Sequence, residues 1–285
     1  MTLKTKINIA NIGLNELFDR KSDIVYGLFH ALSDLGYDVI VTHNSLSAKC
    51  YNLIIGSDIL AGDESAVNNI IHSKFDYAIY EVENFNGKTV NYRRKFDIEN
   101  YKKLLSNSNL VITPYKFNLP HLQAVCGEKK VVYARWGYHN SMIINGGQKS
   151  GQHHYDGLFI GLIKGARVAK YHKLSETAGG KVLFIDQEHP FTFRNFGLLT
   201  SRYGLALSYG ETDNFVNPFR LYLMAANGLP ILADHTVDDD NYLDICECMP
   251  FEEIQDQLTR PAPRTSNILE RCNEMPLTGN LKGVI

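Results

Sequence analysis

Residues 210–234 read GETDNFVNPFRLYLMAANGLPILAD, a succession of loop, helix, turn and strand signals. Asn217 is a suitable helix N-cap, and Pro218 suits the first helical position, where its missing N–H costs no hydrogen bond. Gly228 suits the left-handed position just after a helix. The pattern therefore predicts a helix that begins at Pro218 and ends before Gly228, followed by a short buried strand over 231–233.

One charged residue fits this helix poorly. Arg220 lies in the first turn, where the helix macrodipole disfavours a cation by roughly 0.3–1 kcal/mol. A nearby carboxylate, Glu211 or Asp213, is one explanation. The other is an anion bound jointly by Arg220 and the free N–H groups of the helix start, which together form a phosphate site. The local pattern leaves both explanations open.

Length and composition limit the classes of protein. A chain of 285 residues favours two domains, and 44% hydrophobic residues with a net charge of −2 disfavour a strongly basic nucleic-acid binder. No apolar run approaches the ~20 residues that span a membrane. Five cysteines and a start without a secretory signal lead us to expect a cytoplasmic protein with reduced thiols. The close pair Cys246 and Cys248 has no second Cys/His pair beside it, so no metal site is predicted.

Strands and helices alternate along the first half. Strands are predicted over 7–12, 37–41 and 51–56, with a helix after the first of them, and this order implies a parallel sheet with right-handed crossovers. Gly13 is the one glycine directly after the first strand. The dinucleotide fingerprint Gly-x-Gly-x-x-Gly is therefore absent, and an NAD-binding domain is disfavoured.

A glycine-rich polar stretch over 145–152 separates the two halves. Strands and helices alternate again beyond it, including a strand predicted over 205–209. We therefore predict a domain over 1–148 and a second domain over 149–262. The tail, 263–285, is predicted to be irregular and to pack back on the first domain.

Two acids follow the strand predicted over 77–80. Ligands of open α/β sheets bind beyond the carboxyl ends of strands, so Glu81 and Glu83 are candidates for chemistry. Side chains at i and i+2 leave a strand on the same face, where two carboxylates interact and the pKa of one rises. Solvated loop acids are the alternative explanation.

A basic turn follows the first strand of the second half. It contains Gly161, Lys164 and Arg167 and leads into a predicted helix. Lys and Arg donate charge-assisted hydrogen bonds to phosphate oxygens. The turn is therefore a second candidate for binding an anion.

The ordered set of these motifs resembles the GT-B glycosyltransferases. Arg220 is followed by Ala226-Asn227-Gly228-Leu229-Pro230 and an apolar strand, which is similar to the C-terminal GT-B pattern and to phage DNA β-glucosyltransferases. Asn52-Leu53-Ile54-Ile55-Gly56 and Tyr80-Glu81-Val82-Glu83-Asn84 are similar to strand ends of little-characterised bacterial GT-B proteins. The resemblance covers about residues 22–258. It implies an α/β fold of two doubly wound Rossmann-like domains that face each other across a cleft.

The resemblance also implies a reaction. GT-B enzymes generally move a sugar from a nucleoside diphosphate to a hydroxyl acceptor without a metal ion, and a UDP-sugar is the expected donor here. Lys164, Arg167 and Arg220 would hold the diphosphate. Glu83, with Glu81 in reserve, would take the acceptor proton in an inverting displacement. Further donor-site candidates are Gly13, Gly161, Glu211, Asn214 and Asn217. No motif specifies the acceptor, whether a glycan, a small molecule or modified DNA, and no cofactor is expected beyond the nucleotide sugar.

One position departs from the family pattern. Many retaining GT-B enzymes carry a ribose-binding glutamate five residues before the helix-ending glycine, and this position is Leu223 here. The departure favours an inverting enzyme. It also keeps three alternatives open: a phage-type glucosyltransferase of hydroxymethylpyrimidine DNA, a sugar-nucleotide epimerase, and an inactive GT-B module that binds a partner.

Overall fold

The computed structural model describes residues 5–13, 21–90, 97–144, 153–176, 181–186, 191–209, 216–234, 238–260 and 268–285. The chain divides into two compact units. One unit comprises Met1–Trp136 together with Leu277–Ile285, and the other comprises Gly137–Pro276. The end of the chain therefore belongs to the first unit.

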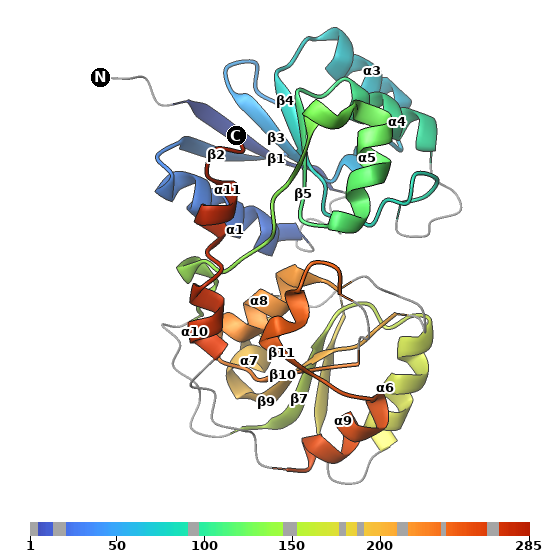
Figure 1. The fold of residues 1–285 in the computed structure, drawn as a ribbon, viewed down its shortest axis with the longest axis vertical. Coiled ribbons are helices and arrows are strands. Elements are labelled where there is room, and N and C mark those ends of the chain that lie inside the picture. Colours follow the sequence, from blue (N-terminus) through green and yellow to red (C-terminus); the bar gives the residue numbers. More distant parts are fainter. Residues whose placement is uncertain are drawn as a thin grey trace. The chain divides into compact units, whose positions relative to one another are not determined.

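The first unit is built on a parallel sheet of order β2-β1-β3-β4-β5-β6 (Figure 1). Its strands are β1 (Lys6–Asn11), β2 (Asp38–His43), β3 (Tyr51–Ile55), β4 (Tyr77–Tyr80), β5 (Leu110–Thr113) and β6 (Val131–Tyr133). Its helices are α1 (Ser22–Asp34), α2 (Ser57–Leu60), α3 (Glu64–His72), α4 (Ile98–Ser106), α5 (Leu119–Cys126) and α11 (Leu277–Leu281). In Figure 1, α1 and α11 cover one face of the sheet, and α3, α4 and α5 cover the other. The strand order reverses at β1, which places the topological switch point between β1 and β3.

The connection from β2 to β3 is a loop, residues 44–50, instead of a crossover helix. Two fully buried amides, Asn8 and Asn52, lie under it and bond to each other at 3.0 Å. Asn52 donates to the carbonyl of Ser47 at 3.0 Å and accepts from the Ser47 N–H at 2.8 Å. Because buried backbone groups require partners, Asn52 has a structural role in the strand pattern to which it belongs.

The second unit repeats this arrangement with a parallel sheet of order β11-β10-β9-β7-β8. Its strands are β7 (Tyr155–Ile160), β8 (Val182–Ile185), β9 (Ser201–Ala206), β10 (Ile231–Ala233) and β11 (Cys246–Cys248). Its helices are α6 (Ala166–Glu176), α7 (Phe191–Thr200), α8 (Pro218–Ala226), α9 (Phe251–Leu258) and α10 (Ile268–Asn273). The predicted architecture of two doubly wound α/β units is confirmed, and the second switch point lies between β7 and β9.

The opening helix prediction is confirmed by α8. It begins at Pro218, and the side chain of Asn217 accepts the N–H of Arg220 at 3.2 Å. Gly228 has a φ of +68°, as the left-handed position after the helix requires. Every residue of α8 except Arg220 is buried, because the helix packs against β9, β10 and the 3-10 turns η4 (Asn140–Met142) and η6 (Tyr242–Ile245).

Two strand predictions in this unit were wrong. β9 spans Ser201–Ala206 instead of 205–209, and β11 was not predicted at all. β9 lies between β7 and β10, where both faces of a strand are buried. Arg202 is accommodated there by an ion pair with Asp156 at 2.9 Å. The polar start of β9 therefore concealed the strand in the sequence.

Candidate functional site

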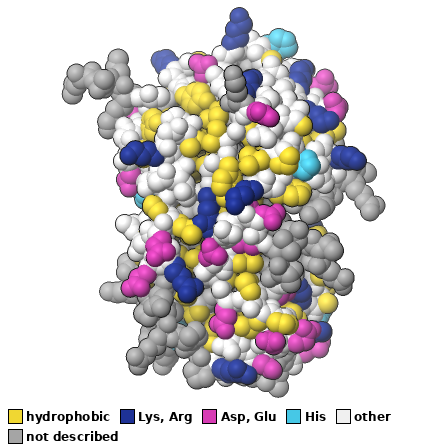
Figure 2. Space-filling model, in the orientation of Figure 1, with side chains coloured by type: hydrophobic (Ala, Val, Ile, Leu, Met, Phe, Trp, Pro, Cys, Tyr) yellow, Lys and Arg dark blue, Asp and Glu magenta, His cyan; other side chains and the backbone are white. Residues whose placement is uncertain are grey.

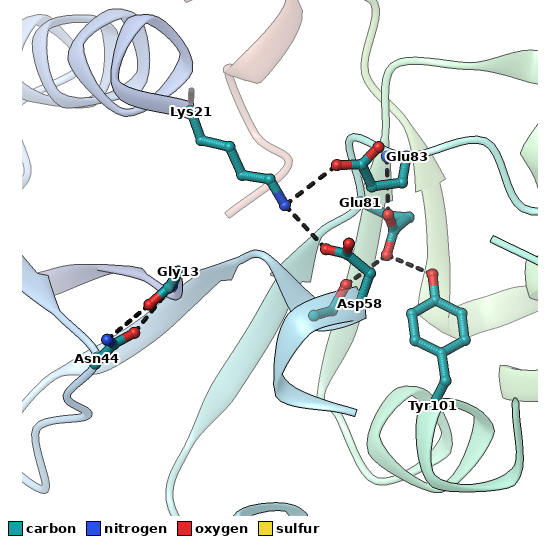
Figure 3. A network of polar contacts seen from close by, with 8 residues as sticks. Gly13, Lys21, Asn44, Asp58, Glu81, Glu83 and Tyr101 are labelled. Carbon is teal, nitrogen blue, oxygen red and sulfur yellow. Dashed lines mark hydrogen bonds and ion pairs between the residues drawn. The ribbon is translucent and has the colours of Figure 1, made fainter. Parts of the chain in front are cut away.

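In the first unit, polar side chains gather beyond the carboxyl ends of β3 and β4, next to the switch point (Figure 3). Gly56 makes this possible. It has a φ of +95°, and a Cβ at this position would lie 2.2 Å from the carbonyl oxygen of Ile12. The tight turn starts α2 directly after β3 and brings Ser57 and Asp58 to the sheet edge.

Glu81 is buried at this edge, with 1% of its surface exposed. One carboxylate oxygen accepts from the hydroxyls of Ser57 at 2.6 Å and Tyr101 at 2.5 Å. The other accepts from the N–H of Glu83 at 2.9 Å. Burial raises the pKa of Glu81 to about 7, although the hydrogen bonds from Ser57 and Tyr101 oppose the rise. The proximity of Asp58 adds to it.

A buried lysine connects the other two carboxylates of the cluster. The Nζ of Lys21 lies 2.9 Å from Oδ1 of Asp58 and 3.2 Å from Oε1 of Glu83. Burial by itself lowers the pKa of Lys21, but the negative charges of Asp58 and Glu83 outweigh it and raise the pKa above its usual value. Lys21 is therefore a permanent cation between two carboxylates.

The two acids singled out in the sequence thus have different environments. Glu83 keeps 19% of its side chain exposed and pairs with Lys21, whereas Glu81 is enclosed. The expected rise in pKa occurs at Glu81, but burial and Asp58 cause it, and Glu83 contributes only its N–H. Glu83 is accordingly the acid that has access to a substrate.

Sequence reasoning missed Lys21 and Asp58. Asp58 had a usable signal, because it follows the predicted strand 51–56 just as Glu81 follows its strand. Lys21 had none, since it precedes α1 and is distant in sequence from both of its partners. Only the fold brings it to the carboxylates.

Gly13 lies just beyond the carboxyl end of β1 and is paired with Asn44 (Figure 3). The Asn44 side chain accepts the Gly13 N–H at 2.9 Å and donates to its carbonyl at 2.8 Å. Both backbone groups of Gly13 are therefore engaged within the protein. Its assignment to donor binding stays a prediction.

In the second unit, the start of α8 lies at the switch point between β7 and β9. A small pocket there is lined by ends of both strands and by Arg167, Asn217 and Arg220. Gly161 follows β7 with a φ of +151°, and a Cβ at this position would lie 2.3 Å from a guanidinium nitrogen of Arg220. Gly161 is thus required for Arg220 to lie at the end of β7.

The basic turn after β7 divides its cations between two roles. Arg167 donates to the carbonyl of Leu207 at 2.8 Å and stacks on the rings of Phe159 and Tyr209, each 5.4 Å away. Lys164, in contrast, has an exposed side chain. Glu211 and Asn214, like the alternative partner Asp213, lie outside the described residues.

Leu223, which replaces the ribose-binding glutamate of the family pattern, is 5% exposed in α8. Its carbonyl accepts from the side chain of Asn227 at 2.8 Å. This position is part of the apolar core of the second unit, so it offers no polar contact to a ribose.

The described residues contain no group of three or more His, Cys, Asp or Glu side chains placed to hold a metal ion. None of the helices in the described part of the chain is long and apolar enough to cross a membrane. Basic and acidic side chains are interspersed on the described surface drawn in Figure 2. This face therefore lacks the one-sided basic field expected of a protein that binds duplex DNA by charge.

No protein-family model and no curated protein matches the sequence. Solved structures do resemble the chain. The co-structure of S. aureus MnaA with UDP is 10% identical, with a TM-score of 0.49, and the match covers 95% of this chain and 87% of that one. The glycosyltransferase SnogD from Streptomyces nogalater is 10% identical, with a TM-score of 0.45, and the match covers 99% and 96%.

A UDP-GlcNAc 2-epimerase from Methanocaldococcus jannaschii is 11% identical, with a TM-score of 0.41, and the match covers 96% and 93%. The similar structures thus include a glycosyltransferase and an epimerase, two enzyme classes that the sequence motifs had raised. At TM-scores below 0.5 these likenesses do not choose between them. The function of this chain has to be inferred from its own residues.

Proposed function

We propose that the protein binds a nucleoside-diphosphate sugar and transfers the sugar to a hydroxyl acceptor, with inversion and without a metal ion. The observation that carries the proposal is the position of Arg220 over Gly161, beside the start of α8 at a switch point. A helix start and a guanidinium favour the same ligand, a phosphate group. Lys164, whose exposed side chain extends from the neighbouring turn, is the second cation for a diphosphate.

Charge develops on the leaving diphosphate as the sugar is transferred. Arg220, Lys164 and the N–H groups at the start of α8 stabilise this charge, which is the largest demand of the reaction on the protein. Arg167 contributes by holding the end of β9, since its Nε is bonded to the Leu207 carbonyl. UDP-sugars are the expected donors.

The first unit supplies the proton acceptor. The acceptor oxygen bonds to the anomeric carbon, and the bond from that carbon to the phosphate oxygen breaks. The electron pair leaves on the diphosphate, and the acceptor proton passes to Glu83. Lys21 holds Glu83 and Asp58 in place, and the backbone N–H of Glu83 is held by Glu81. Glu83 acts as the general base because it is the accessible carboxylate of the cluster.

A second candidate function is epimerisation of the nucleotide sugar. The observation that favours it is the grouping of three carboxyl groups with different environments around Lys21, which suits both removal and return of a proton. An epimerase requires no acceptor. Incubation with UDP-N-acetylglucosamine alone, followed by NMR of the sugar, distinguishes the two: a new epimer identifies an epimerase, and an unchanged sugar favours a transferase.

Binding of nucleotides tests the proposal first. We expect one of UDP, GDP, dTDP and CDP to bind in isothermal titration calorimetry, and Arg220→Ala to weaken binding about 10–100-fold, the worth of charged hydrogen bonds of about 1.5–3 kcal/mol. Lys173→Ala is the matched control, because Lys173 lies on α6 of the same unit with its side chain 57% exposed. Binding of none of the four nucleotides would leave an inactive binding module as the better description.

Turnover tests the general base. Glu83→Gln keeps the size of the side chain but cannot accept the proton, so we expect a rate loss of about 10²–10⁴-fold with nucleotide affinity unchanged. Full activity in this variant would remove Glu83 from the mechanism.

A further inference from the structure

The segment that follows β9, Leu207–Tyr209, is held by α6 through its backbone. Three successive carbonyls each accept a hydrogen bond from the first turns of that helix. The Nε of Arg167 donates to Leu207 at 2.8 Å, the Nζ of Lys170 donates to Ser208 at 3.2 Å, and the N–H of Ala166 donates to Tyr209 at 3.1 Å. Two of the cations that precede or enter α6 therefore bind the protein itself.

A buried ion pair completes this arrangement. The Nζ of Lys170 lies 2.5 Å from Oδ2 of Asp234, which follows β10, and the two side chains are 16% and 3% exposed. Oδ1 of Asp234 accepts the N–H of Ser208 at 2.6 Å. Lys170 also donates to the Ser208 hydroxyl at 2.6 Å. Ser208 is thus held through its N–H, its carbonyl and its hydroxyl.

The held segment touches both parts of the proposed phosphate site. A Cβ at Gly165 would lie 2.9 Å from the carbonyl oxygen of Tyr209, so the turn after β7 is packed directly on this segment. Leu207 lines the same pocket as Asn217 and Arg220 at the start of α8. A shift of Ser208 would therefore move the basic turn relative to Arg220.

We propose that Lys170, Ser208 and Asp234 form a positioning clasp that sets the spacing of the diphosphate site without touching the nucleotide. The inference rests on the proposed function. Stability alone does not account for the clasp, because a buried ion pair costs so much desolvation that apolar residues of similar size are often as stabilising. The fixed geometry of Ser208 is what apolar residues would not reproduce.

The double variant Lys170→Met, Asp234→Leu tests the clasp. It replaces the ion pair by apolar side chains and leaves no unpaired buried charge, so the fold is retained. Calorimetric titration with UDP, GDP, dTDP and CDP should show a dissociation constant raised about 10–100-fold with unchanged stoichiometry, the effect of misplacing a site by about 1 Å. Lys173→Met on the exposed side of α6 is the control and should bind as the wild type does.

The outcomes separate the clasp from the proposed function. Equal affinity in the wild type and the double variant overturns the clasp alone. A reduced stoichiometry with an unchanged dissociation constant also overturns it, because a purely structural role would lower only the folded fraction. Absence of binding in the wild type overturns both proposals. If the double variant does not fold, Ser208→Ala decides, since it removes only the hydroxyl bond to Lys170 and should weaken binding in the same direction.

Discussion

The substitution Glu81→Gln should make the first unit less sensitive to pH. In the wild type, burial raises the pKa of Glu81 from its usual 4.5 to about 7. The glutamine side chain is nearly the same size and stays neutral at every pH. The hydroxyls of Ser57 and Tyr101 can turn to accept from its amide, because hydroxyls act both as donors and as acceptors.

The raised pKa gives the sign and the size of the effect. The folded protein holds the Glu81 proton more tightly than the unfolded chain, so this group stabilises the fold below pH 4.5, and its contribution is lost as the pH rises through 7. A difference of about 2.5 in pKa, at about 1.4 kcal/mol for each pKa unit, corresponds to about 3 kcal/mol. Most of this loss falls between about pH 5 and pH 8.

The protein carries its own probe for this measurement. Trp136 is the single tryptophan of the chain, belongs to the first unit and is 1% exposed beside Tyr80. Urea unfolding followed by tryptophan fluorescence therefore reports on the unit that contains Glu81. We expect the wild type to lose about 2–3 kcal/mol more unfolding free energy than Glu81→Gln between about pH 5 and pH 8.

Glu99→Gln is the matched control, because Glu99 lies on α4 of the same unit with its side chain 78% exposed. This variant should follow the wild-type pH dependence. Parallel pH dependences for the wild type and Glu81→Gln would show that the buried carboxyl does not hold its proton near neutral pH. The account of the first-unit cluster would then be wrong.

Three further changes test other contacts. Gly161→Ala should weaken nucleotide binding about tenfold or more in calorimetry, because the added Cβ would lie 2.3 Å from the Arg220 guanidinium and displace it; unchanged affinity would contradict the proposed phosphate site. Lys21→Met leaves two carboxylates without their cation and should cost about 3–5 kcal/mol of unfolding free energy in the tryptophan assay, whereas an unaltered urea midpoint would refute the pairing. Asn227→Ala removes buried bonds to the Met142 and Leu223 carbonyls and should lower the melting temperature of the second unit, seen by calorimetric scanning as a transition moved by several degrees.

Local chemistry made several features predictable. The helix at 218–226 follows from its own residues, since Asn217 caps it, Pro218 begins it and Gly228 ends it. The alternation of strands and helices likewise predicted two parallel sheets, because parallel strands require crossover connections. Glu81 and Glu83 were found through the rule that places ligands beyond strand ends. Each of these inferences depends on residues close together in the chain.

The amino-acid sequence by itself determined where helices begin and end, which segments are apolar enough to become buried strands, and which acids and bases stand at their ends. Only the tertiary structure decided how those groups are used. Lys21 meets Asp58 and Glu83 across the edge of the first sheet, and burial gives Glu81 its raised pKa. In the second unit, Arg167 bonds to the end of β9, while Arg220 lies over Gly161. The reason is physical: a pKa, an ion pair or a phosphate site depends on distance and burial, and both arise between segments that are far apart in the chain.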